Sequence, residues 1–502
     1  MSKKSEQRKS LLKDAGFYFI LVYAVITIAF IIQLFIVNIL PMKFMIPAVA
    51  VLILLLVGLY YLQLGKKVNH FNKILGKILI VILAVILGIG NWYLYTTGNA
   101  FSKMTGDNTQ TDVVSLIVLK TSGYTEESDL KGKKIGKITI GDTDPIDQAY
   151  AELDKDLNSA FTNIEYKSYQ TYANDLFDGK VDAILVNESS RGLLEDANSN
   201  FTTNTIVIKK YTYTKTTEDI SKNVQVTKEP FSVYITGIDT YGSISTVSRS
   251  DVNMIITVNP KTHQILMTSI PRDYYVPQTC QGNQTDKLTH TGIFGVQCTI
   301  DSVENFFGVT LNYYARVNFS SVVDIVNALG GITVDNPVAF TASDGTYSYA
   351  AGNISMTGEE ALRFARERYN LADGDRDRGK NQMRVITGMI NKMISPSIIT
   401  RYSSIMSAIS GSFQTNMSNN EMTSLVKMQI EDMSSWDIKQ IAVSGPGNAS
   451  AWSPANGNNA WVMEPDMDTV NHAVSLINKM MNGQLVTDAD VSEQASLDAN
   501  AG

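Results

Sequence analysis

Three long apolar segments near the start of the chain limit its fold more than any other feature. Residues 17–40 are almost entirely apolar, residues 44–64 are nearly as apolar, and residues 78–95 form a third run. Each is about long enough to cross a bilayer as a helix. A cleavable signal peptide explains the first run poorly, since no small-residue cleavage site follows it. Three membrane spans are the prediction, with a buried helical hairpin as the alternative for the first two runs.

Basic residues flank these segments unevenly. Five Lys or Arg residues precede the first segment and four lie between the second and third, whereas the link between the first two holds Lys43 alone. Because basic residues tend to stay on the cytoplasmic side, the N-terminus is predicted to be cytoplasmic and the chain after residue 97 extracellular. Trp92, Tyr93 and Tyr95 would then mark the outer interface.

The large remainder of the chain is acidic. Residues 1–97 hold ten basic and two acidic residues, whereas residues 98–502 hold 32 basic and 47 acidic residues. Such a surface repels polyanions unless basic groups are concentrated locally, so no nucleic-acid partner is predicted.

Changes in composition divide the chain into segments. Short β-rich runs alternate with helical stretches over residues 113–226, and longer mixed patterns follow to Gly483. The prediction is an α/β protein with a small α/β accessory domain and a mixed-sheet α/β domain that has helices on both faces. The accessory domain carries no catalytic constellation, and it is interpreted as either a positioning or binding domain or a plain spacer. The predicted segments are a cytoplasmic basic tail (1–16), three transmembrane helices (17–97), a linker (98–112), the accessory domain (113–226), a catalytic domain (229–483) and a disordered tail (484–502).

Local signals place helices and strands in the second domain. Residues 319–329 are a predicted helix closed by Gly330 and Gly331. Thr357 and Glu360 form a capping box that begins a helix over 359–368. Further helices are predicted over 382–394, 420–433 and 467–481, and strands over 231–238, 253–258, 264–270, 332–334 and 438–443.

The chain has two cysteines, Cys280 and Cys298, without Cys-x-x-Cys or His-rich spacing. A zinc site is therefore not predicted. Two alternatives stay open: one disulfide across a short loop if this part is extracytoplasmic, or two separate buried thiols.

Residues 366–382 concentrate four arginines, one lysine and four acids between two apolar-periodic segments. Charged residues also follow or precede predicted strands at Asp239, at Arg249 and Asp251, and at Arg272 and Asp273. Arginine suits phosphate because its planar fork donates two parallel hydrogen bonds, and carboxylates suit Mg²⁺. The set therefore favours a diphosphate with its metal. The alternatives are a polar loop that pairs its own charges and a series of strand-end ion pairs.

Several motifs resemble those of a known family. In chain order they are Thr236-Gly237-Ile238-Asp239, Ser248-Arg249-Ser250-Asp251, Ser269-Ile270-Pro271-Arg272-Asp273, Asp286-Lys287-Leu288-Thr289-His290, Ala328-Leu329-Gly330-Gly331-Ile332 and residues 366–382. Their order over some 250 residues is similar to that of the LytR-CpsA-Psr family. The three spans and the small preceding domain further resemble its capsule-associated CpsA-like branch.

The resemblance implies a transferase that moves a lipid-linked glycan from a polyprenyl diphosphate carrier to peptidoglycan, outside the membrane of Gram-positive bacteria. Asp239 and Asp251 would hold Mg²⁺, with Mn²⁺ as a substitute. Arg249 and Arg272, with Asp375, would be catalytic, and Asp375 is the first candidate for the general base. The diphosphate would be bound by Arg249, Arg272, Arg366, Arg368 and Arg378, with Gln382 beside them.

One position departs from the family pattern, and two further details concern a histidine and the apolar helices. The family usually has Arg where this chain has Asn381, and Arg376 is the alternative source of that charge. His290 is interpreted as a hydrogen-bonding residue that fixes a loop. Apolar residues of the helices over 319–329 and 359–368 are either core or the lining of a channel for the lipid tail.

Two rival functions remain. One is a non-catalytic sensor of polyprenyl phosphates that regulates the capsule synthesis machinery, favoured by three spans where one would anchor an enzyme. The other is a polyprenyl diphosphate hydrolase, in which water replaces the sugar hydroxyl.

Overall fold

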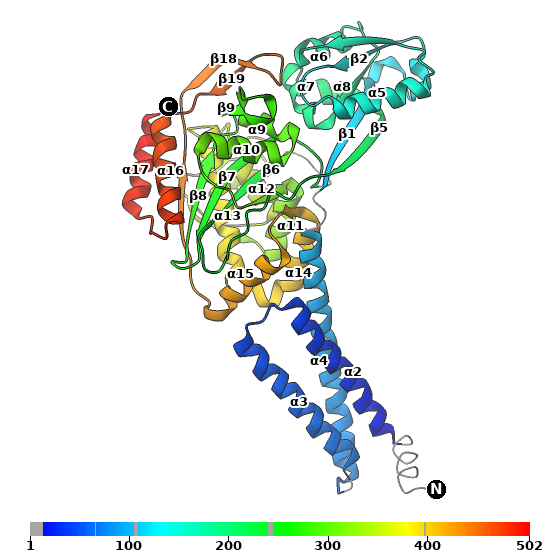
Figure 1. Cartoon of the computed structure of the whole chain (residues 1–502), viewed down its shortest axis with the longest axis vertical. Coiled ribbons are helices and arrows are strands. Elements are labelled where there is room, and N and C mark those ends of the chain that lie inside the picture. Colours follow the sequence, from blue (N-terminus) through cyan, green and yellow to red (C-terminus); the bar gives the residue numbers. More distant parts are fainter. Residues whose placement is uncertain (1–13, 66, 105–108, 239–243, 396–397, 502) are drawn as a thin grey trace. The chain divides into compact units, whose positions relative to one another are not determined.

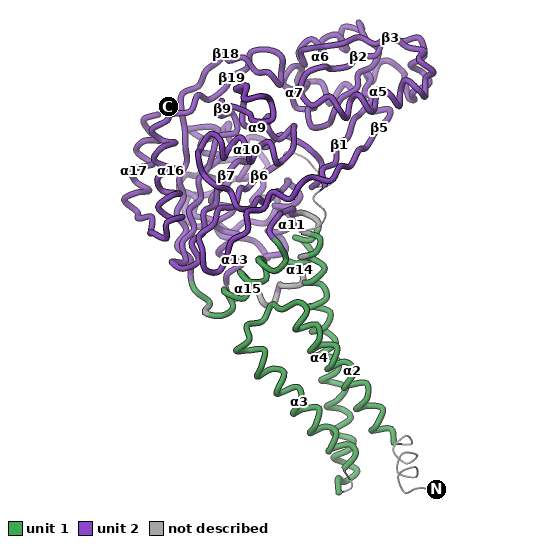
Figure 2. Tube along the Cα trace, in the orientation of Figure 1, with its two compact units in different colours: residues 1–103, 402–410, 418–434 green, residues 104–401, 411–417, 435–502 purple. Residues whose placement is uncertain are grey.

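A computed structural model of the chain describes residues 14–65, 67–104, 109–238, 244–395 and 398–501 (Figure 1). The chain divides into two compact units (Figure 2). The first unit comprises Met1–Lys103, Tyr402–Ser410 and Ser418–Ser434, and the second comprises Met104–Arg401, Gly411–Met417 and Ser435–Gly502.

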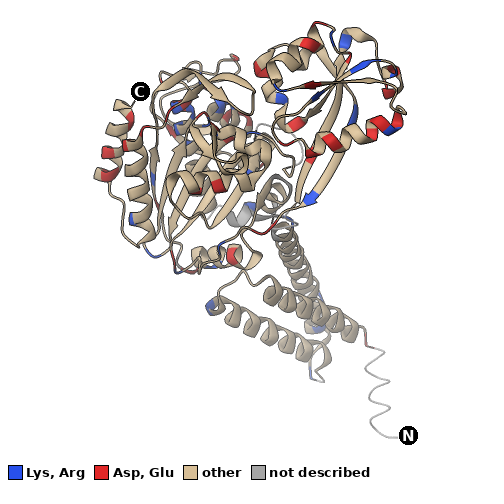
Figure 3. Ribbon diagram, turned by 45° about the horizontal axis from the view of Figure 1, so that its top comes forward, with Lys and Arg blue, Asp and Glu red and all other residues tan. Residues whose placement is uncertain are grey.

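The first unit contains the three apolar helices α2 (Ala15–Val37), α3 (Met42–Leu64) and α4 (His70–Met104). All three are long and apolar enough to cross a membrane, as predicted. Figure 3 shows few charged residues along them. Ile20, Tyr23, Leu59, Ile80 and Leu87 form their shared core, while many other apolar side chains are exposed, as lipid-facing residues would be.

The predicted linker over residues 98–112 is wrong at both ends. Helix α4 continues through polar residues to Met104, because extending an existing helix by a turn requires no new nucleation. Strand β1 already begins at Thr109, where it pairs with Thr216 of β5. The basic residues at positions 3–13 and Lys66 lie outside the described residues, so the orientation of the spans stays a prediction.

Helix α15 (Asn419–Asp432) belongs to the first unit although it was predicted as part of the catalytic domain. The Lys427 ammonium donates a hydrogen bond to Asn38 Oδ1 at 2.6 Å, and the Lys43 ammonium donates one to the Glu431 carbonyl at 2.7 Å. Both contacts attach α15 to the link between the first two spans. Helix α14 (Ile398–Ser412) precedes it in the chain.

The accessory domain is a five-stranded mixed sheet with helices. Its strand order is β3-β2-β4-β1-β5, with parallel pairs β2–β3 and β2–β4 and antiparallel pairs β1–β4 and β1–β5. Leu116, Ile117 and Tyr172 are among its fully buried core residues. The elements are β1 (Thr109–Leu119), β2 (Lys134–Ile138), α5 (Asp144–Asp156), β3 (Thr162–Tyr166), α6 (Tyr169–Phe177), β4 (Ala183–Asn187), α7 (Arg191–Ala197), α8 (Phe201–Asn204) and β5 (Thr205–Thr216).

The second domain is built on a six-stranded mixed sheet of order β16-β11-β6-β7-β8-β17. The pairs β6–β11 and β8–β17 are parallel, and the pairs β6–β7, β7–β8 and β11–β16 are antiparallel. The strands are β6 (Phe231–Ile238), β7 (Ser250–Asn259), β8 (Gln264–Ile270), β11 (Tyr313–Asn318), β16 (Phe413–Thr415) and β17 (Asp437–Ala442).

Helices cover both faces of this sheet, as predicted. Ile255 and Leu266 pack with α10 (Val296–Phe307) and α16 (Met467–Met481) on one face. Met254 and Met267 pack with Met383 of α13 (Asp375–Met393) on the other. Helices α11 (Phe319–Leu329) and α12 (Gly358–Arg366) pack beside α13, and α9 (Leu288–Thr291) lies next to β7. Short hairpins complete the domain: β9 (Tyr275–Gln278) with β10 (Gln284–Lys287), β12 (Ile332–Asn336) with β15 (Gly352–Met356), β13 (Phe340–Thr341) with β14 (Ser348–Tyr349), and β18 (Gly447–Ser453) with β19 (Asn458–Met463).

The predicted helix caps are confirmed. Thr357 and Glu360 form the capping box of α12, and Gly330 ends α11 in the left-handed conformation at φ 77°. Helix α12 ends at Arg366, two residues earlier than predicted. The Glu367 carboxylate accepts the backbone N–H groups of Arg368 and Asn370, which holds the chain in a turn instead of another helical step.

The predicted disordered tail is wrong. Residues Asp488–Asn500 form helix α17, which starts with a capping box at Thr487. The buried Gln494 side chain donates a hydrogen bond to the Ala442 carbonyl of β17 at 2.8 Å. Small acidic residues carry no strong periodic signal, and contacts with distant strands stabilise this helix.

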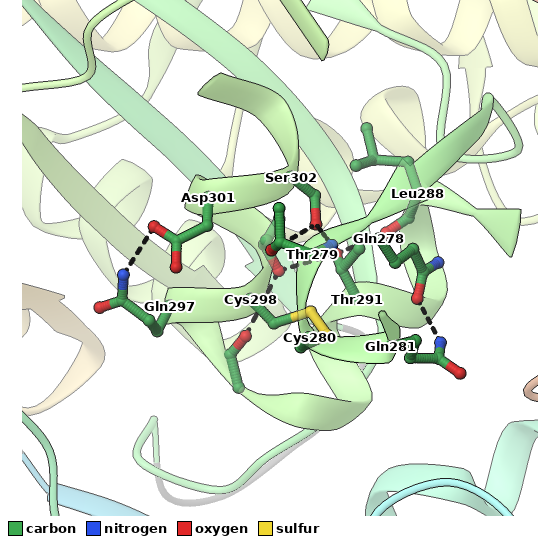
Figure 4. Close-up of a disulfide and its surroundings, with 12 residues drawn as sticks. Gln278, Thr279, Cys280, Gln281, Leu288, Thr291, Gln297, Cys298, Asp301 and Ser302 are labelled. Carbon is green, nitrogen blue, oxygen red and sulfur yellow. Dashed lines mark hydrogen bonds between the residues drawn. A yellow bond between two sulfur atoms is a disulfide. The ribbon is translucent and has the colours of Figure 1, made fainter. Parts of the chain in front are cut away.

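Cys280 and Cys298 form a disulfide, which decides between the two alternatives left open by the sequence (Figure 4). The bond joins the turn after β9 to α10, and the two Cα atoms lie 5.4 Å apart. The Ser302 hydroxyl on the same helix accepts the Thr279 backbone N–H at 3.1 Å. Both contacts fix the loop that leads into β10.

We expect the paired substitution Cys280→Ser and Cys298→Ser to lower the free energy of unfolding by about 3 kcal/mol, since the bond closes a loop whose ends are 18 residues apart. Thermal melting of the full-length protein in nanodiscs, followed by near-ultraviolet circular dichroism, would measure the change. A reducing agent should lower the melting temperature of the wild-type protein and leave that of the double variant unchanged. Equal sensitivity of both proteins to the reducing agent would contradict this expectation.

Candidate functional site

The antiparallel strands of the second domain bring charged residues to one edge of the sheet. Residue Ile238 at the end of β6 pairs with Ser250 at the start of β7, so Arg249 and Asp251 lie at this edge. The end of β8 at Ile270 pairs with Asn253, which places Arg272 and Asp273 at the same edge. The predicted metal ligand Asp239 lies outside the described residues.

Helix α13 delivers the second group of charges. It begins at Asp375, seven residues before the predicted start at residue 382, so half of the charge run is helix and not a loop. Asp375 and Asp377 occupy its first turn, where carboxylates favour the positive end of the helix dipole. Arg378 and Gln382 are four residues apart and therefore share one helix face.

These elements line a cleft of about 730 Å³. The structure brings together seven of the nine predicted site residues there: Arg249, Asp251, Arg272, Arg366, Arg368, Arg378 and Gln382. An eighth, Asp375, lines a small adjoining pocket that shares Asp251, Arg272, Arg378 and Gln382. The predicted set thus forms one site, apart from the undescribed Asp239.

Ion pairs fix the centre of the cleft. Arg272 Nη1 lies 2.9 Å from Asp251 Oδ1, and the Thr289 hydroxyl donates to the same oxygen at 2.9 Å. Lys287 Nζ lies 3.1 Å from Asp273 Oδ1. Burial by itself would raise the pKa of Asp251 and of Asp273, but the neighbouring cations, Arg272 first, hold both pKa values below the usual range. Both carboxylates are therefore ionised at neutral pH.

Asp375 has a different electrostatic environment. Its Oδ1 lies 2.5 Å from Arg378 Nη2. Burial raises the pKa of Asp375 above its usual value and nearby Asp273 raises it further, while Arg378 and Arg272 only partly oppose this. A carboxyl with a raised pKa beside a cleft lined by arginines suits general-base chemistry.

The rest of the charge run divides into two groups. The Arg366 guanidinium stacks over the Phe319 ring at 4.0 Å, and Arg368 stacks over Tyr369 at 4.5 Å. Both arginines line the cleft. Lys380 pairs with Asp377 at 3.4 Å, and Arg378 pairs with Asp375 at 2.5 Å, so the self-pairing that the alternative interpretation expects does occur within the run.

The departure at Asn381 does not leave a gap in the cleft. The Asn381 side chain is buried, and its Oδ1 accepts a hydrogen bond from Arg384 at 2.7 Å. Arg376 does not replace the missing charge in the main cleft, because its Nη1 donates to the Asp498 carbonyl of α17 at 3.1 Å. The arginines already present supply the positive charge.

His290 is buried, and its Nδ1 lies 3.0 Å from Asp286 Oδ1. Asp286 also accepts the Ser453 hydroxyl at 2.8 Å and the Ala455 backbone N–H at 2.9 Å. The interpretation of His290 as a loop-fixing residue is confirmed. Among the apolar candidates for a lipid channel, Ile325, Val326, Leu362 and Phe364 are buried, whereas Phe319 lines the cleft.

Sequence reasoning missed part of the cleft lining. Arg363 lies one helical turn before Arg366 on α12, and that spacing could have identified it. No local signal marks the contribution of the accessory domain, which includes Gln170 and Asp196. Residues of the accessory domain therefore lie beside the predicted site.

The carboxylate of Asp251 is a kind of ligand that Mg²⁺ takes, but the described residues do not form a complete protein site for the ion. Within the described ranges there is no group of three or more His, Cys, Asp or Glu residues that could hold a metal. Mg²⁺ usually takes one or two carboxylates and fills its other positions with water and phosphate oxygens. Asp251 is the one predicted ligand that the structure places, and it lies at the cleft.

Comparison with known proteins decides the family. The LytR_cpsA_psr family model matches residues 197–475, more than half of the chain. The chain belongs to the LytR-CpsA-Psr family. The three spans and the accessory domain up to residue 196 lie before the part that matches, whereas α8 and β5 lie within it.

Similar LytR-CpsA-Psr proteins carry transferase names. The polyisoprenyl-teichoic acid–peptidoglycan teichoic acid transferase TagU of Enterococcus faecalis is 38% identical over 248 residues, which cover 48% of this chain and 80% of that protein. A Bacillus anthracis protein of the same name is 37% identical over 235 residues, covering 47% and 74%. The crystal structure of B. subtilis TagU aligns at 32% identity with a TM-score of 0.40, covering 52% of this chain and all of that one.

Proposed function

We propose that this protein is a membrane-anchored transferase that moves a glycan from a polyprenyl diphosphate carrier to peptidoglycan. The glycan is a capsular polysaccharide or a related anionic glycopolymer. The transferase names of the relatives support the reaction type, with teichoic acid as the polymer in their case. The capsule synthesis machinery is the partner that would supply a capsular donor.

The observation that carries this proposal is the convergence of five predicted arginines on one cleft. They come from different parts of the domain: Arg249 precedes β7, Arg272 follows β8, Arg366 ends α12, Arg368 lies between α12 and α13, and Arg378 lies in α13. A diphosphate is the ligand that such a cluster suits, because each guanidinium can donate paired hydrogen bonds to phosphate oxygens. In an otherwise acidic chain, this concentration of positive charge selects a polyanion locally.

The proposed step is a phosphoryl transfer. The acceptor oxygen on peptidoglycan forms a bond to the phosphorus that carries the glycan, while the bond from that phosphorus to the bridging oxygen breaks. Polyprenyl phosphate leaves, and the acceptor proton passes to the Asp375 carboxylate. Arg272 and Arg378 stabilise the negative charge that grows on the leaving phosphate.

A divalent ion completes the proposed site. Asp251 and Asp239 would hold Mg²⁺ or Mn²⁺, and the ion would neutralise charge on the diphosphate. The Asp251 carboxylate stays ionised beside Arg272, as a metal ligand must.

The proposed location is the cell membrane, with the N-terminus cytoplasmic and the second unit extracellular. Basic residues before the first span and between the second and third support this orientation. The Cys280–Cys298 disulfide agrees with it, because such bonds persist in oxidising compartments.

Reconstitution tests the proposal. Full-length protein in nanodiscs, given a polyprenyl-diphosphate-linked capsular glycan, peptidoglycan fragments and Mg²⁺, should form a glycan–peptidoglycan conjugate detectable by mass spectrometry. We expect EDTA to stop the reaction and added Mg²⁺ or Mn²⁺ to restore it. Equal turnover with and without EDTA would contradict the requirement for a metal ion. Absence of any conjugate would contradict the transferase activity.

The same assay separates the two rivals. Release of polyprenyl phosphate without an acceptor, at the rate seen with one, would indicate a hydrolase. A second experiment tests the sensor hypothesis: residues 1–97 are replaced by one unrelated membrane anchor. A transferase should then still complement a deletion strain, whereas a transducer should not.

A further inference from the structure

The cleft has two chemically different sides. The first holds the arginines, whereas the second, which we call the wall, is the set of lining residues from the accessory domain and from the β18–β19 hairpin. The second set is uncharged apart from Asp196 and consists of amides, small apolar residues and aromatic rings. The amide and aromatic members that bear on the argument are Gln170, Asn456, Asn458, Asn459 and Trp461.

Contacts with the rest of the domain hold this second side in place. The Tyr169 backbone N–H donates a hydrogen bond to the Asn456 carbonyl at 3.0 Å, which joins α6 to the turn of the β18–β19 hairpin. Ala455 of the same turn is buried in the accessory core. A side chain at Gly457 would collide with the Lys167 carbonyl, at 2.2 Å from its Cβ, so the two segments touch through backbone. The wall is therefore formed before any ligand binds.

The wall lies close to the phosphate-binding side. Asp196 Oδ2 of α7 is 3.0 Å from Arg249 Nη1, and the Arg249 side chain is only 13% exposed. A group attached directly to a diphosphate at Arg249 would therefore reach the accessory domain.

The chemistry of the wall suits a sugar ring. Trp461 is 44% exposed and lines the cleft, so part of its ring is available for stacking on a pyranose face. Asn456 Oδ1 and Asn458 Oδ1 accept no hydrogen bond from the described part of the chain. Both oxygens are shielded from solvent, and leaving a buried acceptor without a partner is costly, so a sugar hydroxyl that reached either oxygen would be favoured.

We propose that the accessory domain and the β18–β19 hairpin together form a sugar-binding subsite of the cleft. Its ligand is a neutral or N-acetylated pyranose, either the donor sugar next to the diphosphate or a sugar of the peptidoglycan acceptor. The proposal rests on the proposed function and adds a role for the accessory domain, most of which precedes the family match.

Binding to full-length protein in nanodiscs tests it with two probes, bare polyprenyl diphosphate and polyprenyl diphosphate N-acetylglucosamine. Trp461→Ala should weaken binding of the sugar-bearing probe about tenfold, the effect of one lost aromatic contact, and leave the bare probe unchanged. Gln170→Ala should act in the same direction, which tests the accessory side separately. Trp452→Ala is the matched control, since Trp452 is 55% exposed on the same hairpin and does not line the cleft.

The outcomes distinguish the sources of the sugar. If the variants lose affinity for the sugar-bearing probe only, the subsite binds the donor sugar. Unchanged binding of both probes with a KM for peptidoglycan raised at least about fivefold assigns it to the acceptor. Wild-type values for both measurements in Trp461→Ala and Gln170→Ala would overturn the subsite while leaving the transferase proposal intact. If the wild-type protein binds neither probe, that result contradicts both the proposed function and the subsite.

Discussion

Arg272→Ala should lower the rate of glycan transfer by roughly 10²- to 10³-fold, the effect seen when one preorganised charge-stabilising donor is removed from an active site. Arg272 lies at the centre of the cleft, with its Nη1 2.9 Å from Asp251 and Asp273 following it in the chain. Its loss removes a diphosphate ligand and also leaves the Asp251 carboxylate without its main partner. Single-turnover kinetics with the lipid-linked glycan would measure the effect.

Folding must be separated from chemistry in this variant. Breaking a buried ion pair costs about 3–5 kcal/mol of stability, so the melting temperature is measured alongside turnover. Arg272→Lys keeps the charge but loses the paired hydrogen bonds, and we expect it to fold and to be slow. Arg384→Ala is the control, because Arg384 donates to Asn381 outside both pockets. Wild-type turnover in a folded Arg272→Ala protein would contradict a role for Arg272 in the reaction.

Asp375→Asn should lower kcat by about 10²- to 10⁴-fold and change its dependence on pH. A general base works only when it is deprotonated, so wild-type activity should fall as the pH drops through the pKa of Asp375. Burial and the nearby Asp273 carboxylate raise that pKa. The acid limb of the pH profile, where activity falls as the pH drops, should therefore lie above the usual pKa of aspartate, which is about 4. The asparagine variant should lack the limb, and a pH profile of kcat/KM would measure it.

Asp377→Asn provides the comparison on the same helix. Asp377 pairs with Lys380 at 3.4 Å and lines neither pocket. Its variant should keep both the rate and the acid limb of the wild-type protein. An acid limb that persists at the same pH in Asp375→Asn would assign the base to another group.

Much of the fold was predictable because its signals are local. Strands β6 and β8 and helices α11 and α16 begin and end where the period of apolar residues and the capping residues indicated. The predictions were wrong where contacts with residues distant in the sequence outweigh the local preference for helix or loop. Helix α17 forms from small acidic residues because Gln494 bonds to β17, and α12 stops early because Glu367 caps a turn.

The candidate site was predictable to a similar degree. The sequence identified five of the six arginines that line the cleft and missed Arg363. It also singled out Asp375 as the first candidate for the general base, but it gave no physical difference between the four acids of residues 366–382. The structure adds that difference: Asp375 lies beside Arg378 and lines the small pocket, whereas Asp377 pairs with Lys380. Burial, which sets the pKa of Asp375, depends on residues from β7 and β8.

The sequence by itself determined the three apolar helices, the α/β character of both domains and the charged residues that would meet an anionic substrate. Those features follow from length, hydrophobic period and short motifs, which act within one element. The tertiary structure alone decided that Cys280 and Cys298 are bonded and that Asp196 of the accessory domain meets Arg249. It also decided that Trp461 faces the same cleft. These contacts join residues far apart in the chain, and no local pattern encodes the packing that brings them together.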